Sequence, residues 1–203
     1  MNPLAPFIPW IDLFGIAVFA ASGALAAARR EQTLVTFAFF ALVTGVGGGT
    51  VRDLLIDAPV FWVRDWRVAA VCLSTAALIW LTPRRWWNVR ALDWFDAVGL
   101  AAYAVFGAGK ALAYGVPPVP AALMGVVTGC VGGIIRDVLA GEPSILMRPE
   151  LYVTAAALAA SLFVLLTWFG IAPGIAAPIA ALTGFTLRAF AIARGLKLPA
   201  YRR

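Results

Sequence analysis

Two glycine-rich segments, each followed by an arginine and an aspartate, are the parts of this chain best suited to act on ions. They are Gly45–Gly49 with Arg52 and Asp53, and Gly129–Gly133 with Arg136 and Asp137. Each glycine inside a helix costs about 1 kcal/mol relative to alanine, so both clusters predict points where a helix kinks or unwinds. Carbonyl oxygens freed there, with no carboxylate beside them, suit a dehydrated monovalent cation such as K+.

The candidate ligands of that cation are glycine carbonyls and two threonine hydroxyls. The residues are Gly47, Gly48, Gly49, Gly132 and Gly133, joined by Thr44 and Thr128, which lie about one helical turn before the clusters. The alternative is close helix packing, because small residues let membrane helices approach each other. Two clusters at matching places of a repeated sequence favour an ion or substrate site over packing.

The charged residues allow more than one interpretation. Each Arg-Asp pair either neutralises itself near an interface, pairs across the molecule, or takes part in the ion path. Lys110 has no adjacent acid, so it either extends to the membrane interface or acts as a mobile cation near the pore, where it repels permeant cations or responds to voltage. Asp12 and Asp96 stand near the start of apolar segments, where we expect them to cap helix N-termini.

The composition predicts an integral membrane protein. Of the 203 residues, 63% are hydrophobic and 13% are charged, whereas soluble chains average roughly half and a quarter. The chain has no histidine, which excludes Ser-His-Asp chemistry and imidazole metal sites, and we expect neither an enzyme nor a bound cofactor. Cys72 and Cys130 lie in apolar runs, where we expect small buried residues.

The apolar runs predict seven transmembrane helices, since a bilayer core needs about 20 apolar residues per helix. They are Ile8–Ala28, Thr33–Ile56, Val68–Leu81, Phe95–Tyr114, Val119–Ala140, Leu151–Phe169 and Gly174–Ala193. The third is short, but arginine and tryptophan side chains on its flanks can anchor it at the interface.

Basic residues concentrate in alternate connections between these helices. Those on one side are Arg29, Arg30, Arg84, Arg85, Arg90, Arg148, Arg188, Arg194, Lys197, Arg202 and Arg203. Membrane topology thus explains the net charge of +6, which does not indicate nucleic acid binding. The positive-inside rule places the N-terminus outside and the C-terminus inside, and this arrangement needs an odd number of helices.

The chain aligns with itself at a shift of 84 positions without a gap. Asp12 then meets Asp96, Thr44-Gly45 meets Thr128-Gly129, and Arg52-Asp53 meets Arg136-Asp137. Each unit holds three helices, so the second enters the membrane from the opposite side, as in the inverted repeats typical of transporters and some channels. The expected fold is all-α, with a single transmembrane domain over residues 1–203: repeat one at 8–82, repeat two at 92–170 and an extra helix at 174–193.

The doubled Gly-Gly-x-x-Arg-Asp motif, on a plan of three, three and one helices, resembles the prokaryotic branch of the trimeric intracellular cation (TRIC) channel family. The resemblance covers roughly Asp12 to Arg194. It implies a homotrimer in a bacterial inner membrane, in which each protomer has its own pore for potassium and other monovalent cations. The kinked glycine segments of the second and fifth helices would line the pore, and Lys110 would match a lysine associated with gating.

Two departures from the family bear on function. Val131 stands where a third glycine is expected, and Ala111-Leu112-Ala113 follows Lys110 in place of the charged stretch of animal members, so their lipid and calcium-store roles are not carried over. The expected function is passive potassium conduction, with a second copy of the chain, membrane lipids, K+ and Na+ as partners. Bacterial relatives have also been described as glycine transporters, which makes a secondary transporter of a small zwitterion the alternative.

Overall fold

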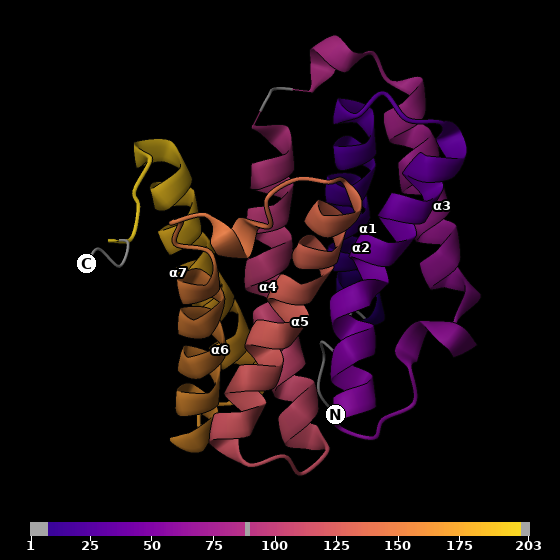
Figure 1. The fold of residues 1–203 in the computed structure, drawn as a ribbon. Coiled ribbons are helices and arrows are strands. Elements are labelled where there is room, and N and C mark those ends of the chain that lie inside the picture. Colours follow the sequence, from indigo (N-terminus) through magenta and orange to yellow (C-terminus); the bar gives the residue numbers. More distant parts are fainter. Residues whose placement is uncertain (1–7, 88–89, 200–203) are drawn as a thin grey trace.

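A bundle of α-helices runs through residues 8–87 and 90–199, the part of the chain that this computed structural model describes (Figure 1). Within these residues the helices are α1 (Ile8–Arg29), α2 (Leu34–Leu55), α3 (Trp66–Leu81), α4 (Ala91–Ala113), α5 (Pro118–Leu139), α6 (Val153–Trp168) and α7 (Pro173–Arg194). Each helix coincides with one predicted segment, and no end differs by more than four residues. Arg202 and Arg203, which the topology prediction used, lie outside the described residues.

The helices differ in length. By length and composition, α1, α2, α4, α5 and α7 can each cross a membrane, whereas α3 and α6 have 16 residues each. The prediction of a short third helix is confirmed, but α6 is shorter than the expected Leu151–Phe169. The chain just before α6 is not helical. There the Leu198 N–H donates to the carbonyl of Pro149 at 2.7 Å, and Glu150 forms a β-bridge with Lys197.

The internal repeat is visible in the helix bounds. Adding 84 to the bounds of α2 gives 118–139, which are the bounds of α5. A 3₁₀ helix follows each of them, η2 at Phe61–Arg64 and η4 at Ile145–Met147, and the two begin at equivalent positions. The third 3₁₀ helix of the described residues, η3 (Arg84–Trp86), lies in the connection between the repeats.

Equivalent helices run in opposite directions. Lys110 of α4 contacts Asp53 of α2, so the C-terminal ends of these helices share one end of the bundle, called the Lys110 end below. Arg30, just after α1, pairs with Glu142, just after α5, at 2.7 Å, so the C-terminal ends of α1 and α5 share the other end, called the Ala26 end. α2 and α5 are therefore antiparallel, as an inverted repeat requires.

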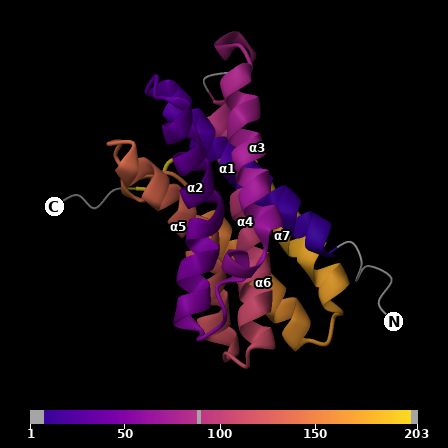
Figure 2. The same ribbon diagram turned by 90° about the vertical axis from the view of Figure 1, so that its right-hand side faces the viewer.

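The centre of the bundle is made by α1, α2, α4 and α5. α2 packs against α5, α1 against α4, and α4 against α5. Figure 1 shows α4 and α5 between the group of α1 to α3 and the pair α6 and α7. The perpendicular view shows that the helices are tilted against one another (Figure 2).

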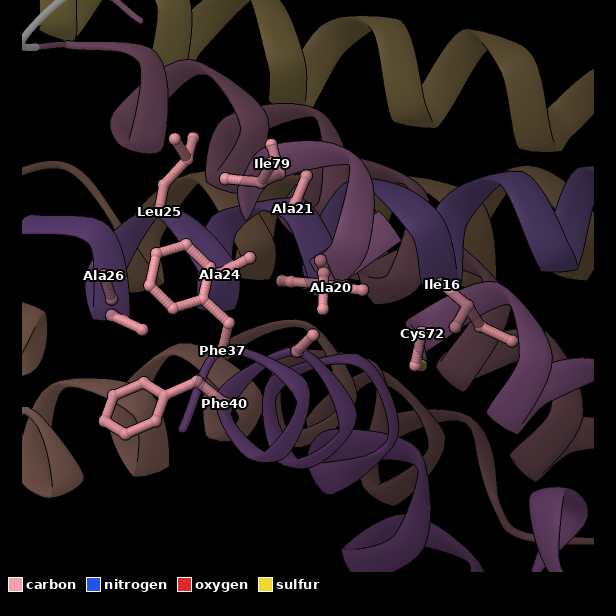
Figure 3. Close-up of a cluster of buried hydrophobic side chains, with 14 of the residues drawn as sticks. Ile16, Ala20, Ala21, Ala24, Leu25, Ala26, Phe37, Phe40, Cys72 and Ile79 are labelled. Carbon is pink, nitrogen blue, oxygen red and sulfur yellow. The ribbon is translucent and has the colours of Figure 1, made fainter. Parts of the chain in front are cut away.

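Small side chains on α1 let α2 and α3 pack closely on it. The cluster in Figure 3 includes Ile16, Ala20, Ala21, Ala24, Phe37, Phe40, Cys72 and Ile79. Cys72 and Cys130 are both buried free cysteines, which confirms the sequence interpretation.

The surface and interior show the distribution expected when lipid is the solvent. Large apolar side chains are exposed, among them Val35, Leu81, Val119, Met147 and Trp168. Buried charged side chains are Arg52, Asp53, Asp96, Arg136, Asp137 and Arg188. Charged residues inside membrane proteins face the bundle interior and mark functional sites by default.

Candidate functional site

The glycine clusters of α2 and α5 meet where the two helices cross. Gly48 lies against the carbonyl oxygen of Thr128, and Gly132 lies against the carbonyl oxygen of Thr44. A Cβ atom at either glycine would collide with that carbonyl, so a side chain there would force the helices apart. Close packing, one of the two interpretations of the clusters, is therefore a role of Gly48 and Gly132 in this fold.

Both helices continue through their glycine clusters. The backbone is α-helical over Leu34–Leu55 and Pro118–Leu139, so neither cluster is unwound. Unwinding does not occur because each helix packs closely on the other there and supports the backbone. Cation binding by the carbonyls of these clusters, including those of Gly47, Gly49 and Gly133, stays a prediction.

The two threonines predicted beside the ion path are buried between helices. Thr128 donates its hydroxyl to the carbonyl of Met124 at 2.6 Å. The Thr44 hydroxyl has no hydrogen-bond partner within residues 8–87 and 90–199. Gly23 of α1 and Gly107 of α4, which are equivalent in the repeat, lie directly against Thr44 and Thr128. Both hydroxyls therefore sit where α1, α2, α4 and α5 come closest.

Asp53 binds two cations at the Lys110 end. Arg52 donates to Oδ1 of Asp53 from Nε at 2.8 Å and from Nη2 at 2.7 Å, and Lys110 Nζ lies 2.8 Å from the same oxygen. Oδ2 of Asp53 accepts the N–H of Phe61 at 3.0 Å. The side chain of Lys110 is 19% exposed and that of Arg52 is 1% exposed. Lys110 therefore pairs across the two repeats and does not extend freely to the interface.

Aromatic rings surround Arg52, and one of its nitrogens is unpaired. The guanidinium carbon lies 6.0 Å from the ring centre of Phe61 and 5.5 Å from that of Phe106, within the range of cation–π attraction. Nη1 of Arg52 has no hydrogen-bond partner in the part of the chain that the structure describes. The acid of α1, Asp12, instead accepts a hydrogen bond from the Tyr103 hydroxyl at 2.8 Å.

The equivalent arginine at the other end is fully paired. Arg136 donates to Asp137 from Nε at 2.9 Å and from Nη2 at 2.8 Å. Its Nη1 lies 2.5 Å from Oδ1 of Asp96 and also donates to the hydroxyl of Ser22. Oδ2 of Asp137 accepts the N–H of Ile145 at 2.8 Å. Two carboxylates and a hydroxyl thus bind this guanidinium, and no lysine joins them.

A cavity of about 110 Å³ opens at the Ala26 end. It reaches Arg136 and Asp137, and Ala26 forms part of its wall. Other residues of its wall are exposed at the end of the bundle, namely Arg29, Arg30 and Glu142. Ala26 is the repeat equivalent of Lys110, so the cavity lies where a lysine would otherwise reach the ion pair.

The expected capping role of two acids is wrong. Asp12 and Asp96 lie inside α1 and α4, which begin at least four residues before them. α4 begins at Ala91, one turn before the predicted start at Phe95. The prediction began too late because the first turn of α4 contains Asp93 and is too polar to count as part of an apolar run. These acids bind Tyr103 and Arg136 instead.

Among the side chains that contact the charged groups, sequence reasoning missed Tyr103, Phe106 and Ser22, which lie on equivalent faces of α4 and α1. The repeat contained a signal for them. At the shift of 84, Tyr103 aligns with Phe19 and Phe106 aligns with Ser22, so a polar and an apolar side chain exchange places on equivalent faces of α1 and α4.

This geometry defines an α-helical membrane protein of two inverted three-helix repeats and a seventh helix, with buried ion pairs near both ends. The model of the glycine transporter family matches residues 9–84 and 93–168. The chain therefore belongs to that family, and the two matches begin 84 positions apart, as the repeat predicts.

Similar proteins from several bacteria are described as membrane proteins. A UPF0126 membrane protein of Vibrio cholerae is 46% identical over 151 residues, which cover 71% of this chain and 62% of the relative's length. The inner membrane protein YadS of Escherichia coli is 43% identical over 152 residues, covering 72% of each chain. YvgT of Bacillus subtilis is 36% identical over 170 residues, covering 79% of this chain and 80% of that protein.

Solved TRIC channels have the same fold. The TRIC orthologue from Rhodobacter sphaeroides superposes with a TM-score of 0.85 at 42% identity, covering 92% of this chain and 97% of that one. A prokaryotic TRIC channel solved in 0.5 M KCl superposes with a TM-score of 0.86 at 25% identity, covering 96% and 100%. The resemblance inferred from the Gly-Gly-x-x-Arg-Asp motifs is confirmed.

Proposed function

We propose that this protein is a cation channel that conducts potassium and other monovalent cations passively, as a homotrimer with one pore in each protomer. The observation that carries the proposal is the fold shared with the Rhodobacter sphaeroides TRIC channel orthologue, at 42% identity over 92% of this chain. An inverted repeat with buried charges near both ends fits a path for ions through the bundle.

The path runs between α2 and α5 from the cavity at the Ala26 end to the ion pair at the Lys110 end. The cavity gives water and ions access to Asp137 and the end of α5. The crossing of the glycine clusters forms the narrow middle, where Gly47, Gly48, Gly49, Gly132 and Gly133 line the path, with Thr44 and Thr128 beside it. Opening this crossing lets the glycine carbonyls face a dehydrated cation.

Lys110 closes one end. Its ammonium lies 2.8 Å from Oδ1 of Asp53. A permeant cation at this end would approach the same carboxylate oxygen. A cation in the path is repelled while Lys110 stays, so conduction requires that the lysine leave Asp53. A charge that crosses the membrane field gains about 2.3 kcal/mol per 100 mV, which makes this gate sensitive to voltage.

A secondary transporter of glycine or a similar zwitterion is the second candidate. The family description favours it, and so does the unpaired Nη1 of buried Arg52, since a guanidinium nitrogen is a donor for a substrate carboxylate. Transporters with inverted repeats bind their substrates near the middle of the membrane between the repeats.

Currents across a planar bilayer containing the purified protein, under a KCl gradient, test the proposal. Discrete unitary steps that reverse near the potassium potential are expected. A silent bilayer, together with saturable glycine uptake into proteoliposomes of the same preparation, would overturn the channel in favour of the transporter. Lipid without protein and protein denatured before reconstitution are the controls.

Assembly and topology have separate tests. The mass of the detergent-solubilised protein by light scattering is expected to correspond to three copies of the 21.5 kDa chain. Reporter fusions in a bacterial inner membrane are expected to place the N-terminus outside and the C-terminus inside. A monomeric mass would remove the homotrimer from the proposal.

A further inference from the structure

One face of α4 contacts three charged side chains of repeat one at the Lys110 end. The contacts are Tyr103 with Asp12, Phe106 with Arg52, and Lys110 with Asp53. The three α4 residues are spaced by three and four positions, which places them on the same side of the helix. A movement of α4 therefore changes all three contacts together.

The equivalent face of α1 is different. Its residues are Phe19, Ser22 and Ala26, of which only Ser22 can form a side-chain hydrogen bond. Phe19 stands at the position of Tyr103 and has no hydroxyl, and the acid at that end, Asp96, pairs directly with Arg136. The Ala26 end thus shows the arrangement that the same charges adopt when these three residues replace Tyr103, Phe106 and Lys110.

Repeat one contains the equivalent acid and arginine, Asp12 and Arg52, but the structure shows no ion pair between them. Nη1 of Arg52 is buried without a hydrogen-bond partner among the described residues, whereas Nη1 of Arg136 binds a carboxylate. Asp12 stands in repeat one at the position of Asp96, whose Oδ1 lies 2.5 Å from Nη1 of Arg136. A buried donor without a partner is costly, so Arg52 is left in a state that a second carboxylate would stabilise.

We propose that Tyr103 holds Asp12 away from Arg52 in the closed channel and that Asp12 becomes the partner of Arg52 when the channel opens. The displacement of α4 that withdraws Lys110 also withdraws the other two side chains of its face. Asp12 then pairs with the free Nη1 of Arg52, as the equivalent acid does at the Ala26 end. This inference rests on the proposed channel function.

The exchange gives each state of the gate its own ion pair. In the closed state, Lys110 is paired with Asp53, and the Tyr103 hydroxyl donates a hydrogen bond to Asp12. In the open state, the free energy lost with the Lys110 contact is offset by the new ion pair of Asp12 with Arg52. A two-state element needs alternative contacts of comparable free energy, and this exchange supplies them.

Single-channel recordings of two variants test the proposal. It predicts that removing the donor and removing the acceptor of the hydrogen bond between Tyr103 and Asp12 change channel opening in opposite directions. Tyr103→Phe frees Asp12 and is expected to raise the open probability about tenfold, the scale of one hydrogen bond to a charged group. Asp12→Asn weakens the pair with Arg52 and is expected to shorten the mean open time about threefold. In the double variant, the increase from Tyr103→Phe is expected to disappear.

Two further variants guard against a purely structural effect. Phe106→Ser gives Arg52 the hydroxyl that Ser22 gives Arg136, and it is expected to raise the open probability only while Asp12 is charged. Tyr152→Phe removes a buried hydroxyl beside Gly133 at the Ala26 end, where no exchange of partners is proposed, and is expected to leave the open probability within about twofold of the original protein.

The outcomes separate this inference from the proposed function. Changes of the same sign in Tyr103→Phe and Asp12→Asn, or an increase in Tyr152→Phe as large as that in Tyr103→Phe, would overturn the exchange while the unmodified channel still conducts. If Asp12→Asn does not assemble, an unchanged open probability in Tyr103→Phe and Phe106→Ser overturns it equally. A protein that conducts no potassium in any form would overturn the proposed function instead.

Discussion

The Lys110 end and the Ala26 end contain the same Arg-Asp pair in the same backbone setting, yet among the described residues only Asp53 is also paired with a lysine. Asp53 and Asp137 each accept a backbone N–H from the 3₁₀ helix that follows, at 3.0 and 2.8 Å. The ends differ at three positions on equivalent faces of α4 and α1. The helices of the two repeats therefore follow the same plan, and the proposed gate is a small asymmetry added to it.

The largest effect is expected when the Lys110 end is made like the Ala26 end. Lys110→Ala leaves the pair of Arg52 with Asp53 intact and removes the cation that is proposed to block the path. Potassium efflux from loaded proteoliposomes is expected to rise about tenfold, since a hydrogen bond between charged groups contributes about 1.5–3 kcal/mol. Efflux equal to that of the unmodified protein would mean that Lys110 does not close the channel; Lys110→Arg, which keeps the charge, is the control.

The reverse change is expected to have the next largest effect. Ala26→Lys places an ammonium in the cavity beside Asp137, where it can form the contact that Lys110 forms with Asp53. Potassium efflux is expected to fall about tenfold because both ends are then closed. Ala26→Met fills similar volume without charge and separates block by charge from block by size. A normal efflux in Ala26→Lys would contradict the equivalence of the two ends.

The helix crossing offers a test of symmetry. Gly48→Ala and Gly132→Ala each place a methyl group against a backbone carbonyl, and we expect each to destabilise the folded protein by about 1–3 kcal/mol. Thermal unfolding in detergent should show similar losses for both. Gly47→Ala, whose methyl group would mainly meet the end of the Ile135 side chain at 3.2 Å, is the matched control with a smaller loss.

The crossing also bears on conduction. If the alanine variants assemble normally but carry no potassium, the glycines line the path as proposed. If the variants assemble poorly but the folded fraction conducts potassium normally, the glycines serve only in helix packing.

The smallest effect is expected at the buried threonines. Thr128→Val removes a hydrogen bond of 2.6 Å to the Met124 carbonyl and is expected to cost about 0.5–1.5 kcal/mol of stability. Thr44→Val removes a hydroxyl without a partner in the described residues, so no loss or a small gain is expected. Unfolding measurements on both variants in the same detergent compare them, and equal losses would contradict the difference between the repeats.

Most of the fold could be predicted from the sequence because apolar length and the repeat of 84 positions are local signals. They placed seven helices, the antiparallel relation of α2 and α5, and the burial of both cysteines. The non-helical segment before α6 could not be predicted, since it contacts residues near the C-terminal end of the described chain.

The site was harder to predict because its contacts cross the repeats. Lys110 and Asp53 are 57 positions apart, and no local pattern links them. The glycine clusters suggested unwinding, but support from the opposite helix keeps both helices intact. Asp96 was misplaced at a helix end because the polar first turn of α4 was not counted as helix. Asp12 was given a capping role although the predicted first helix already began four residues before it, at Ile8.

The voltage dependence of a variant with exchanged ends tests the central claim most directly. In patches of bacterial spheroplast membrane, where orientation is fixed, potassium currents of the unmodified protein would be compared with those of the double variant Lys110→Ala with Ala26→Lys. The blocking lysine then lies at the opposite end of the field, so the voltage polarity that opens the channel is expected to reverse. Currents that open at the same polarity in both proteins would contradict a gate formed by the lysine.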